Sequence, residues 1–399
     1  MMARSGATLA LALTLLAWPI ATVAAEAEPD AAVGHVYVLN NNLFGTNSIS
    51  VFNRLADGTL SAAGITDIGG AGSLAAFSDG TQGSLIRTRD GKRLFAVDAG
   101  SNQISVLDVD DGHLSLAGVF PSGGAGPVSL TFQGGLLYVL NAANADAHAS
   151  ANVTGFRVDP AGGLHPIAGS KRPLSSAHPN AAQVQLDPSG RTLLVTEKGS
   201  EQPGDPGRID IYSVADDGSL SGPTVMPPVG AIPFGMAFAS RGAHEEVVIS
   251  DVIAQPDGTG GATAYRLKGG TLTAIGGPVP DHQVAPCWMV ITRDGRFAFT
   301  SDADSHAISG YSIGADGSLR LLDSNGATAM TPSDTFPLEE GLSRDSHFLY
   351  VLDSRLLLPS GPGPATLSGF QIDATGHLTS VVDPNGITLP FSAIGLAAD

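Results

Sequence analysis

Two similar stretches of the sequence carry side chains that could do chemistry: IPFGMAF, which starts at Ile232, and APCWMVI, which starts at Ala285. The second contains Cys287, the only cysteine of the chain, beside Trp288. A cysteine acts as a nucleophile when a nearby base or cation favours its thiolate, and otherwise behaves as a small hydrophobic side chain. Because Cys287 takes the variable second place of a repeated Pro-x-x element, we expect it to line a pocket rather than to act as the nucleophile.

A second group of candidate reagents is a column of acids and amides, each at the end of the second strand predicted in a repeat. Its members are Asn40, Asp98, Asn141, Glu197, Asp251, Asp302 and Asp353. Asp and Asn often cap their own turns, which is the interpretation we favour. The alternative is a ring of oxygen ligands at a channel mouth, suited to Ca²⁺ or to a cationic ligand, with Asp98, Asp302 and Asp353 as candidate metal ligands.

Repeating elements must position these residues. A turn of the form Asp-Gly-x-Leu or a close variant recurs seven times, as in DDGHL at Asp110 and DDGSL at Asp216. Each copy follows an alternating stretch such as QISVLD, which predicts a β-hairpin. A further strand such as RLFAVD or TLLVTE precedes each hairpin, and most of these follow another strand. Four short strands in about 50 residues, seven times over, predict an all-β, seven-bladed β-propeller with four-stranded antiparallel blades.

The two ends of the repeat array are complementary. The first repeat enters at GHVYVLN without a leading strand, and the chain ends in LPFSAIGLAAD, which resembles that missing strand. We therefore predict that the C-terminal strand completes the first blade and closes the ring, which leaves no open sheet edge there. The propeller is expected to form one domain over residues 33–399.

The N-terminus has the features of a signal peptide. Arg4 precedes an apolar run from Leu9 to Ile20, and small residues lead to a predicted cleavage site after Ala25. Residues 1–25 are therefore predicted to be removed, and residues 26–32 to form a short flexible segment. No later apolar run is long enough to span a membrane. The sequence predicts a periplasmic or secreted protein.

Composition limits the partners. The formal net charge of −18 opposes binding to the phosphates of nucleic acids. A single cysteine cannot form an intramolecular disulfide, so the fold must be stabilised by burial. We expect a monomer whose partner is a small-molecule ligand.

Two segments carry a family resemblance: PSGRTLLVTEKGS with GRIDIYSVADDGSL, and TRDGRFAFTSDADSHAISGYSIGADGSL. They resemble the seven-bladed lactonase family, which includes bacterial 6-phosphogluconolactonase and the fungal carboxymuconate-lactonising enzyme. The resemblance extends from about Val33 to Asp399. It implies chemistry on small lactones or their hydroxy acids, with no metal or other cofactor required. It also implies three site elements: a His and then a Pro-Arg-His at the heads of two successive innermost strands, and a Glu that ends the strand after these.

The sequence departs from the family at each of these places. Ala182 stands at the position of the first His, with His178 four residues earlier, and Phe234 and Gly235 replace Arg-His. Asp251 replaces the Glu and is one methylene shorter. Because an arginine would bind a carboxylate or phosphate, its replacement argues against a phosphorylated sugar lactone as substrate.

Two functional hypotheses follow. The first is a hydrolase for a neutral lactone, with Asp251 or Glu197 as the base, His178 as a helper, and Phe234 and Trp288 as the pocket wall. Cys287 and Glu339 are further candidate pocket residues, and Arg87 is a candidate counter-charge to Glu339 and Glu340. The second hypothesis is a secreted binding or scaffold propeller that has lost the catalytic site.

Overall fold

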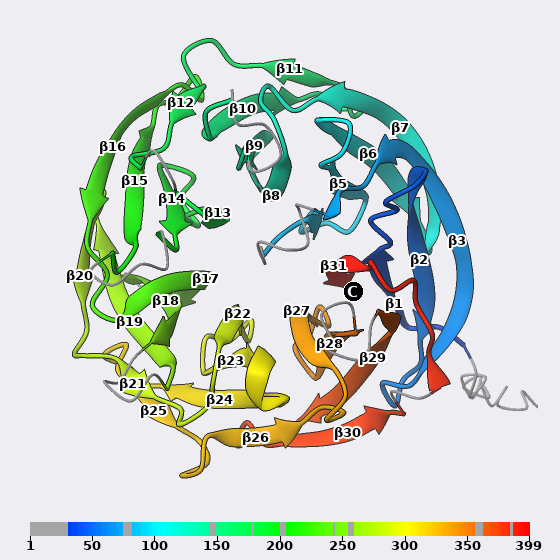
Figure 1. Cartoon of the computed structure of the whole chain (residues 1–399), viewed down its shortest axis with the longest axis vertical. Helices are drawn as coiled ribbons and strands as arrows, with labels where there is room; N and C mark the ends of the chain where they lie inside the picture. The colour runs from blue at the N-terminus through cyan, green and yellow to red at the C-terminus, as the bar shows by residue number, and fades with distance from the viewer. Residues whose placement is uncertain are drawn as a thin grey trace, which may run out of the picture.

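The computed structural model describes residues 31–74, 82–143, 149–176, 179–199, 205–241, 244–253, 259–355, 362–383 and 386–399. It is an all-β ring of seven antiparallel sheets around a central channel (Figure 1). The predicted seven-bladed propeller is therefore confirmed. The residues of the candidate signal peptide lie outside the described ranges. Within those ranges no helix has the length and apolar character that a membrane span requires.

Each blade is built from strands that run in order from the channel to the rim. The first four blades contain β31 (Ile394–Ala398), β1 (Gly34–Leu39), β2 (Thr46–Arg54) and β3 (Leu60–Ala71); β4 (Leu85–Arg87), β5 (Arg93–Asp98), β6 (Gln103–Asp110) and β7 (His113–Pro121); β8 (Pro127–Gln133), β9 (Leu136–Asn141), β10 (Asn152–Val158), β11 (Leu164–Pro166) and β12 (Arg172–Pro173); and β13 (Ala181–Leu186), β14 (Thr192–Glu197), β15 (Arg208–Val214) and β16 (Leu220–Met226).

The last three blades have the same arrangement. They contain β17 (Ala231–Arg241), β18 (His244–Ile253), β19 (Gly261–Lys268), β20 (Thr271–Ala274) and β21 (Val279–Pro280); β22 (Pro286–Ile291), β23 (Phe297–Asp302), β24 (Ala307–Ile313), β25 (Leu319–Leu321) and β26 (Ala327–Met330); and β27 (Phe336–Leu342), β28 (Phe348–Arg355), β29 (Gly363–Ile372) and β30 (Leu378–Val382). A short 3₁₀ turn, η1 (Ala303–Ser305), connects β23 and β24.

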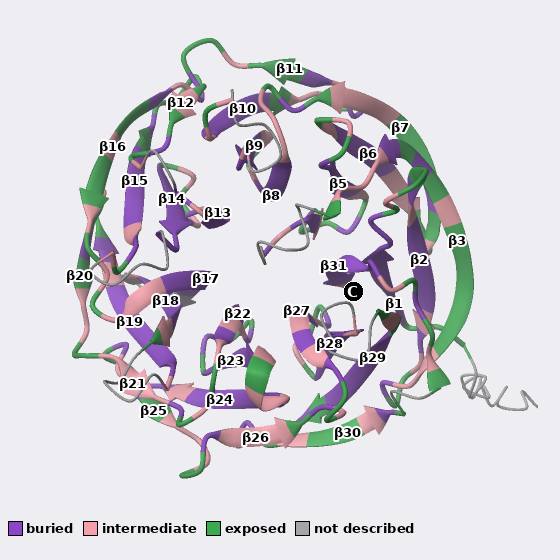
Figure 2. Ribbon diagram, viewed as in Figure 1, coloured by how far each residue is buried: buried purple, intermediate pink, exposed green. Residues whose placement is uncertain are grey.

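Burial follows the position of a strand within its blade. Neighbouring blades cover both faces of the second strands, so β1 and β14 are buried at every residue, whereas the rim strand β3 is mostly exposed (Figure 2). All six tyrosines of the chain are fully buried in the propeller. Tyr138 and Tyr350 each donate a hydrogen bond from the hydroxyl to a backbone carbonyl of an adjoining blade, at 2.7 and 2.8 Å. Burial of these large side chains between blades contributes to the apolar stabilisation of the ring.

The ring closes as predicted. The C-terminal strand β31 pairs antiparallel with β1, with Val36 opposite Ala398 and Leu39 opposite Ile394. The carbonyl of Asp399 accepts a hydrogen bond from Arg54 Nε at 2.9 Å. β31 is thereby the innermost strand of the first blade, and the two ends of the described chain are joined in one sheet.

Candidate active site at the channel mouth

The heads of three successive innermost strands share one local geometry. Pro233, Pro286 and Pro337 each pair with a residue of the acid column, and a β-bulge follows each proline. The bulges take residues 234–235, 287 and 338–339 out of the ladder. Just before two of these prolines, Ile232 and Ala285 have φ angles of 58° and 60°, in the left-handed region. Such strain costs about 1–2 kcal/mol per residue and is concentrated at functional sites.

Hydroxyl groups fix these bulges to the preceding blade. In each case the donor is the residue before a member of the acid column, and the acceptor is a bulge carbonyl of the next blade. The three hydrogen bonds run from Thr196 Oγ1 to Phe234 O at 2.6 Å, from Ser250 Oγ to Cys287 O at 2.5 Å, and from Ser301 Oγ to Leu338 O at 2.7 Å. Each bulge thus has a defined position relative to its neighbour.

The bulged residues meet in a small apolar cluster at the mouth. The rings of Phe234 and Trp288 lie 5.1 Å apart at 55°, with both side chains almost fully buried. Ala182 packs with them, and Val252, Cys287 and Leu338 lie against the group. We call these six residues the mouth cluster. The structure therefore brings together Phe234, Cys287 and Trp288, three of the residues predicted to form the pocket.

Lys198 adds a positive charge to the mouth cluster. Its ammonium nitrogen lies 4.8 Å from the centre of the Phe234 ring, and the side chain is only 7% exposed. The sequence analysis missed this residue, although a signal exists. The residues that directly follow the seven members of the acid column are, in chain order, Asn, Ala, Ala, Lys, Val, Ala and Ser. Lys198 is the only charged residue among these seven. A cation thus lies beside Phe234, where the family resemblance implies an arginine.

Cys287 has the properties of a structural thiol. Its side chain is half-buried against the mouth cluster. Burial raises the pKa of the Cys287 thiol to about 12, although the nearby Lys198 lowers it. The thiol is therefore protonated at neutral pH, which agrees with a residue that lines a pocket and not with a nucleophile.

The acid column is buried within the blades. Four of its five carboxylates accept hydrogen bonds from hydroxyl groups on the third strand of the same blade: Asp98 from Ser105 at 2.7 Å, Asp251 from Thr263, Asp302 from Ser309 at 2.6 Å, and Asp353 from Ser368 at 2.5 Å. These acids cross-link two strands, whereas the sequence interpretation had each one cap its own turn.

The described residues contain no group of three or more His, Cys, Asp or Glu side chains that could hold a metal ion. Asp98, Asp302 and Asp353 lie in three different blades, each bound to its own hydroxyl partner. The calcium site proposed for these three residues stays a prediction, and the geometry gives it no support.

The two carboxylates predicted as bases, Glu197 and Asp251, have no exposed surface. Glu197 Oε1 accepts hydrogen bonds from the backbone N–H and the hydroxyl of Ser175, at 3.0 and 3.2 Å. Burial raises the pKa of Glu197 to about 8 and that of Asp251 to about 7. A base must reach the attacking water, which the geometry of these two residues does not favour. His178, the predicted helper, lies outside the described residues.

Glu339 is buried beside the mouth cluster, with 4% of its surface exposed. It follows Leu338 on β27, and its Oε1 accepts a hydrogen bond from the backbone N–H of Gly83 at 2.9 Å. Arg87, the predicted counter-charge, is not beside it. Arg87 lies four residues after Gly83, at the other end of β4. It forms an ion pair with Asp399 at 2.7 Å. At about 3.3 Å per residue of extended chain, this places Arg87 on the opposite side of the ring from the mouth.

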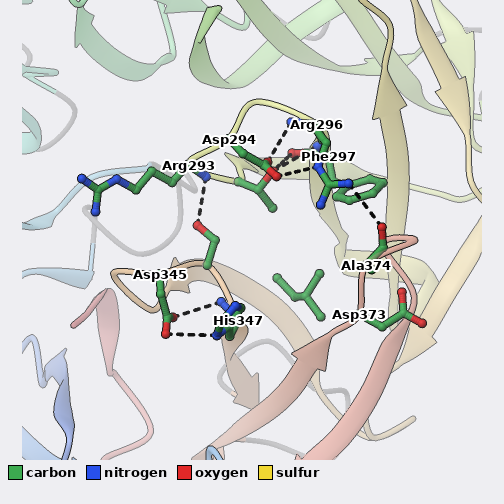
Figure 3. Close-up of a pocket in the computed structure, with 11 residues that line it drawn as sticks. Arg293, Asp294, Arg296, Phe297, Asp345, His347, Asp373 and Ala374 are labelled. Carbon is green, nitrogen blue, oxygen red and sulfur yellow. Dashed lines mark hydrogen bonds and ion pairs between the residues drawn. The ribbon is translucent and has the colours of Figure 1, made fainter.

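A separate pocket of about 430 Å³ lies on that opposite face, between the blades of β22 and β27. Its charged side chains are largely paired with one another. Figure 3 shows Asp294 directed at Arg296, and Asp345 at His347. Arg296 also lies over the ring of Phe297, at 5.0 Å. These contacts lie within single turns, and Arg296 Nη1 also donates to Ala374 O of the adjoining blade at 3.4 Å. We do not assign the catalytic site to this face.

Comparison with known proteins agrees with the fold and with the resemblance. Residues 30–172 match the family model described as "Lactonase, 7-bladed beta-propeller". No curated protein sequence matches the chain. The resemblance to the seven-bladed lactonase family, first noted in the repeat segments, is therefore confirmed.

Solved structures are similar over nearly the whole chain. A putative 6-phosphogluconolactonase of Bacteroides fragilis is 17% identical with a TM-score of 0.64, over 92% of this chain and 98% of that one. A protein of Lactobacillus plantarum is 17% identical with a TM-score of 0.66, over 92% and 99%. The periplasmic gluconolactonase of Pseudomonas aeruginosa is 18% identical with a TM-score of 0.61, over 91% and 99%. At these identities the likeness shows the fold alone.

Proposed function

We propose that this protein is a hydrolase that opens a small, neutral lactone at the channel mouth. The observation that carries the proposal is the ammonium group of Lys198, which lies 4.8 Å from the Phe234 ring in the mouth cluster. Hydrolysis of a lactone develops negative charge on the carbonyl oxygen. A fixed cation in a poorly hydrated site stabilises that charge more than water does. The match to the lactonase family supports the same class of reaction.

In the proposed reaction the lactone ring lies against Phe234 and Trp288, with its carbonyl oxygen toward Lys198. The carboxylate of Glu339 takes a proton from a water molecule, whose oxygen attacks the carbonyl carbon. The ring C–O bond then breaks, and the leaving alkoxide takes the proton back from Glu339. The product is a hydroxy acid. These groups supply the acid, the base and the oxyanion partner, so the reaction needs no metal ion.

The charge of the site favours a neutral substrate. Lys198 is the cation that contacts the mouth cluster among the described residues, and Glu339 and Glu340 place two acidic groups nearby on β27. A phosphorylated lactone would bring at least one further negative charge, and Phe234 stands where the family resemblance implies an arginine that would bind it. We further propose, from the N-terminal segment, that the enzyme acts in the periplasm or outside the cell.

The test is a pH-stat assay of the mature protein with aliphatic γ- and δ-lactones beside 6-phosphogluconolactone. We expect turnover of neutral lactones, and we expect Lys198→Met to lower kcat/KM by about 10²–10³-fold, the usual cost of losing an oxyanion partner. Lys268→Met is the matched control, because Lys268 is exposed at the turn between β19 and β20. Wild-type turnover by Lys198→Met would overturn the proposed role of this residue.

A panel on which no lactone is opened would overturn the proposal as a whole. It would instead favour the alternative that the propeller is a secreted binding module. The comparisons do not favour that alternative.

A further inference from the structure

A short piece of the chain is hydrogen-bonded to the innermost strands of several blades around the central channel. Gln82 and Gly83 precede β4 and lie among the innermost strands of other blades. The backbone N–H of Gln82 donates to Ala182 O on β13 at 3.1 Å, and Gly83 O accepts from the N–H of Leu130 on β8 at 2.9 Å. We call Gln82 and Gly83 the channel floor.

The side chain of Gln82 fastens the floor to the far side of the ring. Its Nε2 donates to Met289 O at 2.7 Å, and its Oε1 accepts from Met289 N–H at 3.0 Å. These bonds satisfy backbone groups at the channel-facing edge of β22, which has no further strand to pair with. Gln183 makes the same pair of bonds to Met236 on β17, at 3.1 and 2.6 Å. Gln183 links adjacent blades, whereas Gln82 links blades on opposite sides of the channel.

Gly235 makes room for this contact. An added Cβ at Gly235 would overlap Gln82 Oε1 and would lie 2.5 Å from Cys287 O. A residue with a side chain at position 235 therefore excludes the observed position of Gln82. Gly235 also stands where the family resemblance implies a histidine. A histidine at position 235 would therefore occupy the place of the Gln82 amide, and the channel floor depends on the glycine found there.

The floor ends at the carboxylate of the proposed site. Gly83 N–H donates to Glu339 Oε1 at 2.9 Å. Gly83 has φ of +85°, a conformation that glycine adopts without strain, and this orients the N–H group. Because Gln82 is held on both its backbone and its side chain, the N–H of the next residue has a fixed direction.

We propose that Gln82 is a positioning residue, which fixes the Gly83 N–H against Glu339 and so determines the orientation and charge of that carboxylate during lactone hydrolysis. This inference rests on the proposed function. A hydrogen bond from a backbone N–H stabilises the ionised form of a carboxylate, whereas burial destabilises it. Burial raises the pKa of Glu339 to about 8, and the Gly83 N–H opposes this rise. If the N–H is released, the pKa of Glu339 rises further, and more alkaline conditions are needed for the base.

The test measures the titration of Glu339 in two ways, one during turnover and one in the absence of substrate. The first readout is the pH dependence of kcat, and the second is the carboxyl band of Glu339 in infrared difference spectra of wild-type protein minus Glu339→Gln. For Gln82→Ala we expect both midpoints to move to higher pH by about one unit, with KM little changed. Gln133→Ala is the matched control, because Gln133 Nε2 also donates to a backbone carbonyl, that of Pro188, at 3.1 Å but on the opposite face.

A second variant, Gly235→Ala, keeps Gln82 but places a Cβ against its amide and against the backbone of Cys287 and Met289, so that these groups must shift. The midpoint is again expected to move to higher pH. Circular dichroism establishes that each variant is folded. A folded Gln82→Ala protein whose infrared midpoint equals that of wild type would overturn the positioning role. If the midpoint moves but no lactone is hydrolysed by wild type, the contact is as inferred and the proposed function is wrong.

Discussion

At the residue scale, Cys287 and Lys198 lie in the same cluster but differ in what their surroundings allow. Because burial raises the pKa of the Cys287 thiol to about 12, alkylation by iodoacetamide at pH 8 should be slow in the folded protein. We expect the rate to be at least about 100-fold below that of the denatured chain. We also expect Cys287→Ala to keep kcat within about twofold, since it removes no charge from the site.

The control for this experiment is Lys198→Met, in which alkylation should remain slow while activity falls. Rapid alkylation of the native protein, accompanied by loss of lactone turnover, would show that Cys287 is a reactive thiol and that the role assigned to it here is wrong.

Parts of the residue-level site could be predicted from the sequence. The repeat alignment placed Phe234, Cys287 and Trp288 at equivalent strand heads, and the structure has them in contact. Arg87 and the floor could not be placed in this way. Arg87 belongs to the turn at the other end of its strand, and Gln82 contacts Met289 across 207 positions of sequence. A repeat alignment gives the place of a residue within its blade, but not the blade that its side chain reaches.

At the scale of elements, the hydroxyl groups that fix the strand heads should be measurable in stability. Ser301→Ala removes the hydrogen bond to Leu338 O and leaves that carbonyl without this donor. We expect a loss of about 1 kcal/mol in the free energy of unfolding. Ser221→Ala, at an exposed position of the rim strand β16, should change it by less than about 0.5 kcal/mol. Urea unfolding followed by tryptophan fluorescence measures both, and equal stabilities would contradict the role of Ser301.

The strands themselves were largely predictable, because period-two alternation before an Asp-Gly turn specifies a hairpin directly. The fourth, outermost strand of each blade was less predictable. In three blades it is broken into two pieces, such as β11 and β12 on β10, or β20 and β21 on β19. The break between β20 and β21, at residues 275–278, contains two successive glycines and a proline. Rim strands face solvent on one side, so they lack a strict apolar pattern. Without that pattern, the sequence does not indicate where strand pairing stops and where it resumes.

At the scale of the whole molecule, the buried carboxyl groups determine how stability depends on pH. Burial raises the pKa of Asp98 to about 6, of Asp353 to about 7 and of Glu339 to about 8, and raises that of Glu340 well above its usual value. In the unfolded chain such groups titrate near pH 4. Between about pH 4 and pH 8 the folded protein therefore binds more protons than the unfolded chain, so its stability falls as pH rises through this range.

Surface carboxylates set the acid limit. Hydrogen bonds from the side chain and backbone of Thr59 lower the pKa of Asp57, and those from Ser219 do the same for Asp217. These groups favour the folded state above about pH 4 and lose that contribution only at lower pH. The protein should accordingly be most stable in mildly acidic solution, near pH 4–5.

Calorimetry from pH 4.5 to pH 8.5 tests this prediction. We expect Tm to fall by several degrees across the range, and we expect Asp353→Asn to make the fall shallower. The amide can still accept the hydrogen bond from Ser368 Oγ, which the carboxylate accepts at 2.5 Å, but it does not ionise. Asp57→Asn should leave this slope unchanged, because Asp57 is exposed and titrates below the range. A Tm that rises from pH 4.5 to pH 8.5 would mean that the buried acids are ionised in the folded protein, held by charges or ions outside the described residues. In that case the acid column would again be the place to search for a bound cation.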